Sequence, residues 1–124
     1  TTYNANLSNT ATQSTMRRGS GATSSSGGNS FRTQGFQNNG ISTSNTDYFE
    51  VKATPVSGKT LTLTRIDANL IGTASFVASP GVTSQFAYSL DGITFTLIGS
   101  PVQSTSLSMT QIDISLHLYA TQKT

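Results

Sequence analysis

The sequence predicts an all-β fold, a two-sheet β-sandwich that is jelly-roll-like, and three observations support this prediction. Apolar and polar residues alternate over several short segments, which is the period of a strand with one buried face. Glycine, proline and asparagine residues that form turns separate these segments. No segment has a convincing helical period, and one apolar face per strand favours two sheets packed face to face.

The chain of 124 residues suits one domain, and its composition changes along its length. Residues 1–9 are predicted to form an N-terminal strand or extension, because their apolar members alternate with polar ones: Tyr3, Ala5 and Leu7. The β-sandwich domain is expected at 10–124. Its first part, 10–45, is rich in Ser, Thr and Gly and by itself is typical of a linker. Its second part, 46–124, holds the main strands.

The first main strand is predicted from an alternation of Phe49, Val51 and Ala53 that ends at Pro55 and Ser57-Gly58-Lys59. The next segment alternates as well, but its apolar phase moves by one residue between two groups: Leu61 and Leu63, then Ile66, Ala68 and Leu70. A slip of one residue would turn the apolar side chains to the wrong face of the sheet. We therefore predict a β-bulge near Thr64-Arg65.

A hairpin is predicted farther along the chain, after a short strand at 76–78 that ends before Pro80-Gly81. Two alternating runs flank Asp91-Gly92, which is typical of a two-residue turn with positive φ: Phe86, Tyr88 and Leu90, then Ile93, Phe95 and Leu97. A final strand is predicted from the alternation of Ile112, Ile114, Leu116 and Leu118. Five aromatic residues fall on predicted inward positions: Phe49, Phe76, Phe86, Tyr88 and Phe95.

Several short motifs occur together in this chain: Arg18-Gly19-Ser20-Gly21, Asn29-Ser30-Phe31, Asp47-Tyr48-Phe49-Glu50-Val51, Ser57-Gly58-Lys59-Thr60-Leu61-Thr62-Leu63 and Tyr88-Ser89-Leu90-Asp91-Gly92. In this order the motifs resemble a β-sandwich module of secreted bacterial cell-surface proteins, over roughly 17–119. The resemblance implies a jelly-roll-like fold and an extracellular accessory role. Such modules usually add further strands after the segment that matches 116–119, and without them a sandwich would expose an edge and an apolar groove.

Catalytic chemistry finds little support in the sequence. The absence of cysteine excludes disulfides, thiolate nucleophiles and zinc–thiolate sites. His117 shares a strand face with Asp113 and Ser115, but residues two apart on a strand lie about 7 Å from each other, beyond hydrogen-bond reach. The carboxylates have no glycosidase-like or calcium-loop spacing. We expect no enzyme activity, no catalytic or metal site and no cofactor, with a structural calcium ion left open.

The charge and the hydropathy of the chain limit the classes of binding partner that we expect. The net charge is +2 and the basic residues form no stripe, so we expect no nucleic acid partner. No apolar run reaches membrane-spanning length. Tyr48 and Tyr119 fall on outward positions and could form a platform for a polysaccharide.

The leading functional prediction is a non-catalytic structural subunit outside the cell, at the cell surface, that assembles with copies of itself into a filament, pilus-like fibre or surface layer. Strand exchange would insert Tyr3, Ala5 and Leu7 of one copy into an acceptor groove of the next. That groove would be flanked by Ile112, Ile114, Leu116 and Leu118. The alternative is a carbohydrate-binding or adhesive accessory module of a larger secreted protein, with Tyr48 and Tyr119 as its glycan platform.

Overall fold

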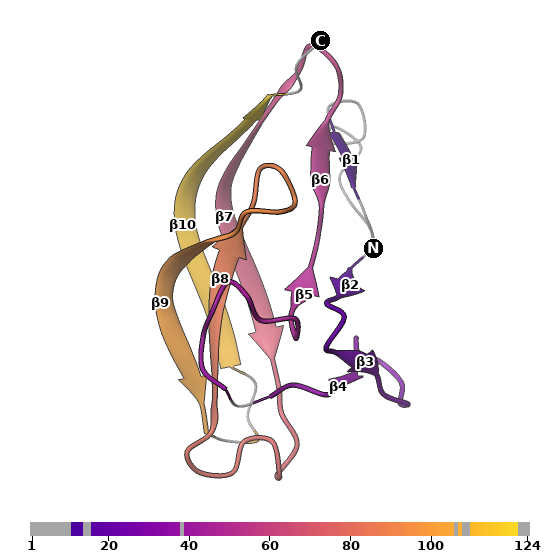
Figure 1. Ribbon diagram of the computed structural model, residues 1–124, viewed down its shortest axis with the longest axis vertical. Coiled ribbons are helices and arrows are strands. Elements are labelled where there is room, and N and C mark those ends of the chain that lie inside the picture. Colours follow the sequence, from indigo (N-terminus) through magenta and orange to yellow (C-terminus); the bar gives the residue numbers. More distant parts are fainter. Residues whose placement is uncertain (1–10, 14–15, 38, 106, 108–109, 122–124) are drawn as a thin grey trace. The chain divides into compact units, whose positions relative to one another are not determined.

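The regular structure of this chain consists of β-strands. A computed structural model describes residues 11–13, 16–37, 39–105, 107 and 110–121. Every regular element within these ranges is a strand, and the strands pair into two-stranded, mainly antiparallel sheets (Figure 1). The predicted all-β, sandwich-like architecture is therefore confirmed.

The chain divides into two compact units. Unit 1 comprises Thr1–Gln37, Ser44–Thr62 and Leu118–Thr124, and unit 2 comprises Asn38–Thr43 and Leu63–His117. Each unit has one buried hydrophobic residue within the described part of the chain, Ala22 in unit 1 and Val77 in unit 2. The strand β7 (Thr60–Leu70) begins in unit 1 and continues into unit 2.

Unit 1 is built from very short strands that pair antiparallel in three sheets. The pairs join β1 (Ala11–Gln13) to β6 (Ala53–Pro55), β2 (Arg17–Arg18) to β5 (Phe49–Glu50), and β3 (Thr23–Ser24) to β4 (Thr33–Gln34). The Ser/Thr/Gly-rich segment, whose composition is typical of a linker, thus contributes the first four strands of the fold.

Two glycines bring the backbone of β2 and its continuation close to the chain before β5. Main-chain N–H groups of Gly19 and Gly21 donate to the carbonyl oxygens of Tyr48 and Thr46, each at 2.9 Å. A Cβ at Gly19 would meet the Thr46 carbonyl oxygen and would lie 2.7 Å from the Tyr48 ring. Only a residue without a Cβ fits at this position, because real Cβ atoms do not approach other atoms so closely.

The predicted single strand through Phe49, Val51 and Ala53 is wrong. This segment forms two strands, β5 and β6, which pair with different partners, β2 and β1. The chain passes between these pairings at Val51-Lys52, and Val51 is exposed instead of facing a core. The turn predicted at Ser57-Gly58-Lys59 is confirmed, since Gly58 has a φ of 74° and the Lys59 N–H donates to the Val56 carbonyl at 3.0 Å.

Unit 2 contains the longest regular pairing described by register, between β8 (Val82–Tyr88) and β9 (Thr96–Ser104). The register shifts between Ser84, which faces Val102, and Phe86, which faces Ile98. The extra residues of this bulge lie on β9 and include Pro101, whose missing N–H suits a position outside the regular ladder. The Gln85 side-chain amide donates to the Gly99 carbonyl at 2.7 Å, within the bulge.

The hairpin predicted around Asp91-Gly92 exists, but its two-residue turn is wrong. Tyr88 pairs with Thr96, so residues 89–95 form a longer loop. Asp91 favours the longer loop because its carboxylate accepts main-chain N–H groups that would otherwise be available to extend the ladder. The strand predicted at 76–78 is also wrong, because the Phe76 and Val77 N–H groups both donate to the Thr73 carbonyl at 3.0 Å and close a turn.

The strand β7 pairs with the C-terminal strand β10 (Thr110–Thr121), and both are long, curved arrows in Figure 1. The burial of β7 follows the predicted change of phase in part. Leu61, Ile66, Ala68 and Leu70 are half-buried as predicted, but Leu63, predicted on the same face as Leu61, is exposed. The strand continues through Thr64-Arg65, and the bulge expected there stays a prediction.

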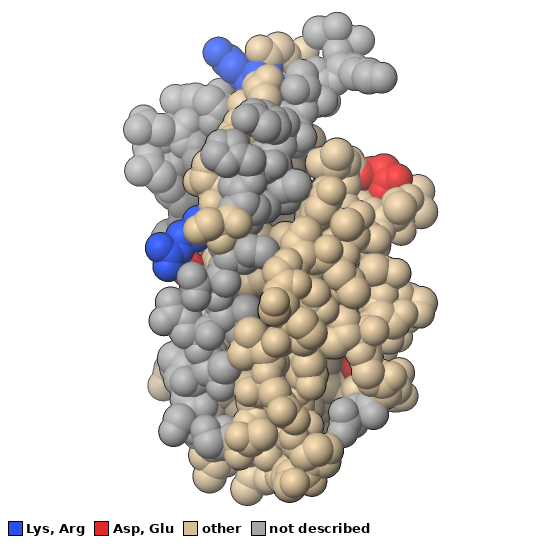
Figure 2. All heavy atoms as spheres, turned by 90° about the vertical axis from the view of Figure 1, so that its left-hand side faces the viewer, with Lys and Arg blue, Asp and Glu red and all other residues tan. Residues whose placement is uncertain are grey.

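The described surface is mostly uncharged. Figure 2 shows one face of the molecule, on which charged side chains are few among the described residues. The ion pair between Arg65 and Asp67 of β7, at 2.9 Å, is exposed to solvent. Such a surface carries little repulsion between copies of the chain, because hydroxyl and amide groups replace most of its charges.

Candidate functional site

An arginine stacked on an aromatic ring is the main polar feature of unit 1. Arg18 of β2 places its guanidinium carbon 3.6 Å from the ring centroid of Phe31, within the range of a cation–π interaction. Its Nε donates to the Thr33 hydroxyl at 2.7 Å and one Nη donates to the Arg32 carbonyl at 2.8 Å. These contacts fix the plane of the guanidinium group.

Three phenylalanines continue this arrangement, and together with Arg18 they are called the Arg18 cluster here: Phe31, Phe36 and Phe49. The Phe31 and Phe49 centroids lie 5.8 Å apart in an edge-to-face arrangement, and the Phe36 and Phe49 centroids lie 5.2 Å apart. Phe31 remains 36% exposed and Phe49 remains 39% exposed. The Arg18 cluster therefore presents aromatic surface to solvent instead of forming a closed core.

The backbone of unit 1 explains how distant residues meet in the Arg18 cluster. Arg18 lies opposite Phe49 in the β2–β5 register, so their side chains are cross-strand neighbours. The β3–β4 hairpin brings Phe31 and Thr33 to the same place, and the Ser25 N–H extends it by donating to the Arg32 carbonyl at 3.2 Å. The loop between these strands contains Asn29 with a φ of 65°, a conformation that asparagine adopts more readily than most residues.

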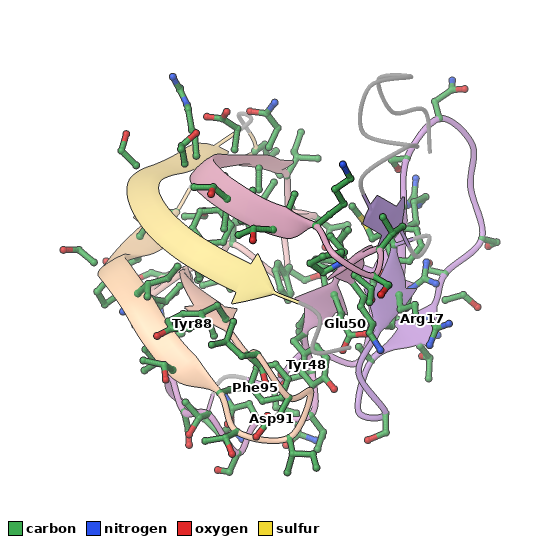
Figure 3. The ribbon with its side chains drawn as sticks, turned by 90° about the horizontal axis from the view of Figure 1, so that it is seen from above. Arg17, Tyr48, Glu50, Tyr88, Asp91 and Phe95 are labelled. Atoms are coloured by element: carbon green, nitrogen blue, oxygen red, sulfur yellow. The ribbon has the colours of Figure 1, made fainter. Side chains whose placement is uncertain are left out.

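The opposite face of the same strands carries different chemistry. Because neighbouring residues on a strand point to opposite faces, Arg17 and Glu50 lie away from Arg18 and Phe49. Arg17 pairs with Glu50 in the β2–β5 register, and Figure 3 labels both residues. The positive charge of Arg17 thus has a carboxylate across the strand, whereas the described contacts of Arg18 are a ring, a hydroxyl and a carbonyl.

In unit 2 the loop between β8 and β9 is organised by one carboxylate, that of Asp91 (Figure 3). Oδ1 of Asp91 accepts the N–H groups of Thr94 at 2.7 Å and Ile93 at 2.8 Å, and the Ser89 hydroxyl at 2.9 Å. These hydrogen bonds, led by that from Thr94, hold the pKa of Asp91 well below its usual range. The loop presents Leu90 and Ile93, which are 71% and 84% exposed.

The residues predicted to carry self-assembly are placed only in part. Tyr3, Ala5 and Leu7 lie outside the described residues. Four predicted acceptor residues all fall on β10, whose strand conformation is confirmed: Ile112, Ile114, Leu116 and Leu118. Their part in an acceptor groove stays a prediction.

The predicted glycan platform is likewise placed in part. Tyr48 is exposed, and its ring lies against Gly19 of the neighbouring chain segment. Tyr119 falls on β10, and its side chain is not among those described. Of the five aromatics predicted to face inward, Phe86, Tyr88 and Phe95 are half-buried. Phe49 and Phe76 are exposed, because β5 is only two residues long and Phe76 lies in a turn.

Neither a metal-binding cluster nor a membrane-spanning helix occurs in the described ranges of the chain. No group of three or more His, Cys, Asp or Glu side chains that could hold a metal ion occurs there. No helix in the same part of the chain is long and apolar enough to cross a membrane.

Comparisons with models of protein families, with curated proteins and with solved structures each gave no match to this chain. The resemblance to modules of secreted bacterial surface proteins therefore stays a prediction.

Proposed function

We propose that the chain is a non-catalytic structural subunit that works outside the cell and assembles with copies of itself by strand exchange. The N-terminal strand of one copy, with Tyr3, Ala5 and Leu7, adds to β10 of the next. Head-to-tail contacts of this kind do not close on themselves, so repetition gives a filament or a layer.

The observation that carries this proposal is the pairing of β10. This strand spans Thr110–Thr121 and, in the described part of the chain, has β7 as its hydrogen-bonded neighbour on one side. The edge of a strand that faces away from its partner presents N–H and C=O groups that can template a further strand. A strand of this length offers room for the whole alternating segment at the N-terminus.

Exposed apolar side chains support the proposal in both units. Ala22 and Val77 are the buried hydrophobic residues of the described ranges, whereas several large hydrophobic residues are exposed, among them Val51, Ile71, Leu90, Ile93 and Leu107. Covering a large aliphatic side chain in an assembly contributes about 1.5–3 kcal/mol. The scarcity of charge lowers the repulsion that would oppose close packing of copies.

The test compares two substitutions on the N-terminal segment, Leu7→Asp and Asn6→Asp. Both introduce one carboxylate, but only Leu7 belongs to the apolar side of the predicted strand. Electron microscopy and analytical ultracentrifugation of the purified chain are expected to show regular assemblies for the unsubstituted protein and Asn6→Asp. Leu7→Asp is expected to remain monomeric, because its charge would have to be buried in the acceptor groove.

A synthetic peptide of residues 1–9 provides an independent measurement. In excess, it should occupy β10 and stop growth, while a peptide carrying Leu7→Asp should have no effect. Assembly of the Leu7→Asp chain, or an unsubstituted chain that stays monomeric at all concentrations, would contradict the proposed function.

A further inference from the structure

We infer that the Arg18 cluster is a binding site for an acidic polysaccharide, in which a uronate carboxylate meets Arg18 and the sugar ring stacks on Phe31 and Phe49. This site lies in unit 1 and involves neither the N-terminal segment nor β10. The inference therefore goes beyond self-assembly and does not depend on it.

The guanidinium group of Arg18 is held in place by contacts that leave N–H donors for an anion. A guanidinium group has five N–H donors, and the contacts to the Thr33 hydroxyl and the Arg32 carbonyl use two of them. None of the contacts described for Arg18 is with a carboxylate. Because its plane is already fixed, the group loses little conformational entropy when it binds a carboxylate through its remaining donors.

The rings beside Arg18 supply the surface that a sugar ring needs. A pyranose has an apolar C–H face, which an exposed aromatic ring can cover by burying apolar area. Phe31 and Phe49 keep about a third or more of their surface exposed, and their mutual contact holds the two rings in place. A cluster that combines an exposed ring with a cation therefore matches a sugar that carries a carboxylate.

The neighbourhood favours a glycan over an acidic peptide. Besides Arg32, whose side chain lies against Gly27, the loop that carries Phe31 has three exposed uncharged side chains with hydrogen-bonding groups, Ser26, Asn29 and Ser30. Such groups can exchange hydrogen bonds with sugar hydroxyls. A peptide rich in Asp and Glu would instead require several cations on one face. Arg17 lies on the opposite face from Arg18, across from Glu50, and Arg32 alternates with Phe31 and Thr33 and lies against Gly27.

The test measures retardation of the full chain in native gels that contain polygalacturonate, with dextran as the neutral polymer. Arg18→Gln and Arg17→Gln form a matched pair, because each removes one positive charge from β2, the first from the face of the Arg18 cluster and the second from the opposite face beside Glu50. We expect polygalacturonate to retard the unsubstituted chain and Arg17→Gln. Arg18→Gln should weaken the apparent affinity about tenfold or more, as expected for the loss of a hydrogen bond to a charged group.

Two further variants separate the parts of the site. Arg18→Lys keeps the charge but loses the planar fork, so it should bind nearly as weakly as Arg18→Gln. Phe31→Leu keeps apolar volume beside Phe49 but removes the ring face, and it should also lose affinity. Far-UV circular dichroism and thermal unfolding of each variant show whether it folds, and any one folded variant of the three is sufficient for the test.

Four outcomes would overturn the inference. An unsubstituted chain that polygalacturonate does not retard has no such site. Equal losses for Arg17→Gln and Arg18→Gln would indicate attraction by net charge alone. Equal retardation by dextran, or by polyglutamate, would reject the uronate as the ligand. A loss on Tyr48→Ala with none on Arg18→Gln would place the sugar on Tyr48 instead. The Leu7→Asp chain should bind as the unsubstituted chain does, so failure of self-assembly and failure of this site can be told apart.

Discussion

The two units form their sheets from strands of different lengths. In unit 1 the strands β2 to β5 are two residues long, so each pair has few main-chain hydrogen bonds. The close backbone approach of Gly19 to Tyr48 and the stacking of Arg18 on Phe31 add to them. In unit 2 the β8–β9 hairpin has strands of 7 and 9 residues in register. Main-chain hydrogen bonds are insensitive to most substitutions, so unit 1 should be far more sensitive to single side-chain changes than unit 2.

The largest effect is expected from Gly19→Ala in unit 1. The new Cβ would meet the Thr46 carbonyl oxygen and lie 2.7 Å from the Tyr48 ring, so the β2–β5 segments would have to separate. We expect a loss of about 3 kcal/mol in the free energy of unfolding, measured by urea denaturation.

Gly28→Ala is the matched control for this substitution. Gly28 is exposed, and nothing lies within 4 Å of a Cβ built on it. Its free energy of unfolding should stay within about 0.5 kcal/mol of the unsubstituted chain. Equal unfolding free energies for Gly19→Ala and Gly28→Ala would show that close backbone approach does not hold unit 1 together.

An intermediate effect is expected from Val77→Ala in unit 2. Val77 is the buried hydrophobic residue of this unit in the described ranges, and the substitution removes two buried methyl groups. The free energy of unfolding should fall by about 2 kcal/mol. Val51→Ala makes the same chemical change at an exposed position and should cost less than about 0.5 kcal/mol. If the two variants unfold at the same urea concentration, Val77 does not anchor its unit.

The smallest effect is expected at Asp91, and it depends on pH. Hydrogen bonds lower the pKa of this carboxyl in the folded state below its unfolded value of about 3.9. Its contribution to stability is therefore fully present above that value and is lost as the pH falls through the folded-state pKa. Asp91→Asn cannot ionise, so its denaturation midpoint should fall less than that of the unsubstituted chain between about pH 5 and about pH 2.

Ser89→Ala sharpens the measurement at Asp91. It removes the hydroxyl donor and leaves the N–H groups of Ile93 and Thr94 in place, so its acid loss should lie between those of the other two chains. Identical acid profiles for all three chains would mean that the carboxylate does not organise the loop.

The sequence predicts unit 2 better than unit 1 for a physical reason. Alternation of apolar residues reports a strand with one buried face, and it correctly indicated Phe86 and Tyr88 on β8 and the strand conformation of β10. Alternation does not report hydrogen bonds made by side chains in a loop. Asp91-Gly92 is therefore predicted to form a two-residue turn, although the Asp91 carboxylate organises the longer loop 89–95.

The candidate site of unit 1 depends on pairings that local sequence cannot reveal. Arg18, Phe31 and Phe49 are far apart in the chain, and they meet because Gly19 and Gly21 let β2 approach the segment before β5. Arg17 and Arg18 are neighbours in the sequence, and the sequence alone does not show that their surroundings differ. That difference follows from the register, which pairs Arg17 with Glu50 and Arg18 with Phe49.

The bulge of β9 has a consequence for how a filament would grow. Pro101 has no N–H to donate, and the register shift opposite Ser84 and Phe86 interrupts the ladder, so an incoming strand cannot form a continuous row of bonds along the outer edge of β9. If copies join through β10, the interrupted edge of β9 disfavours pairing of another copy along β9. Under the proposed function, copies would then add at β10 and not along β9.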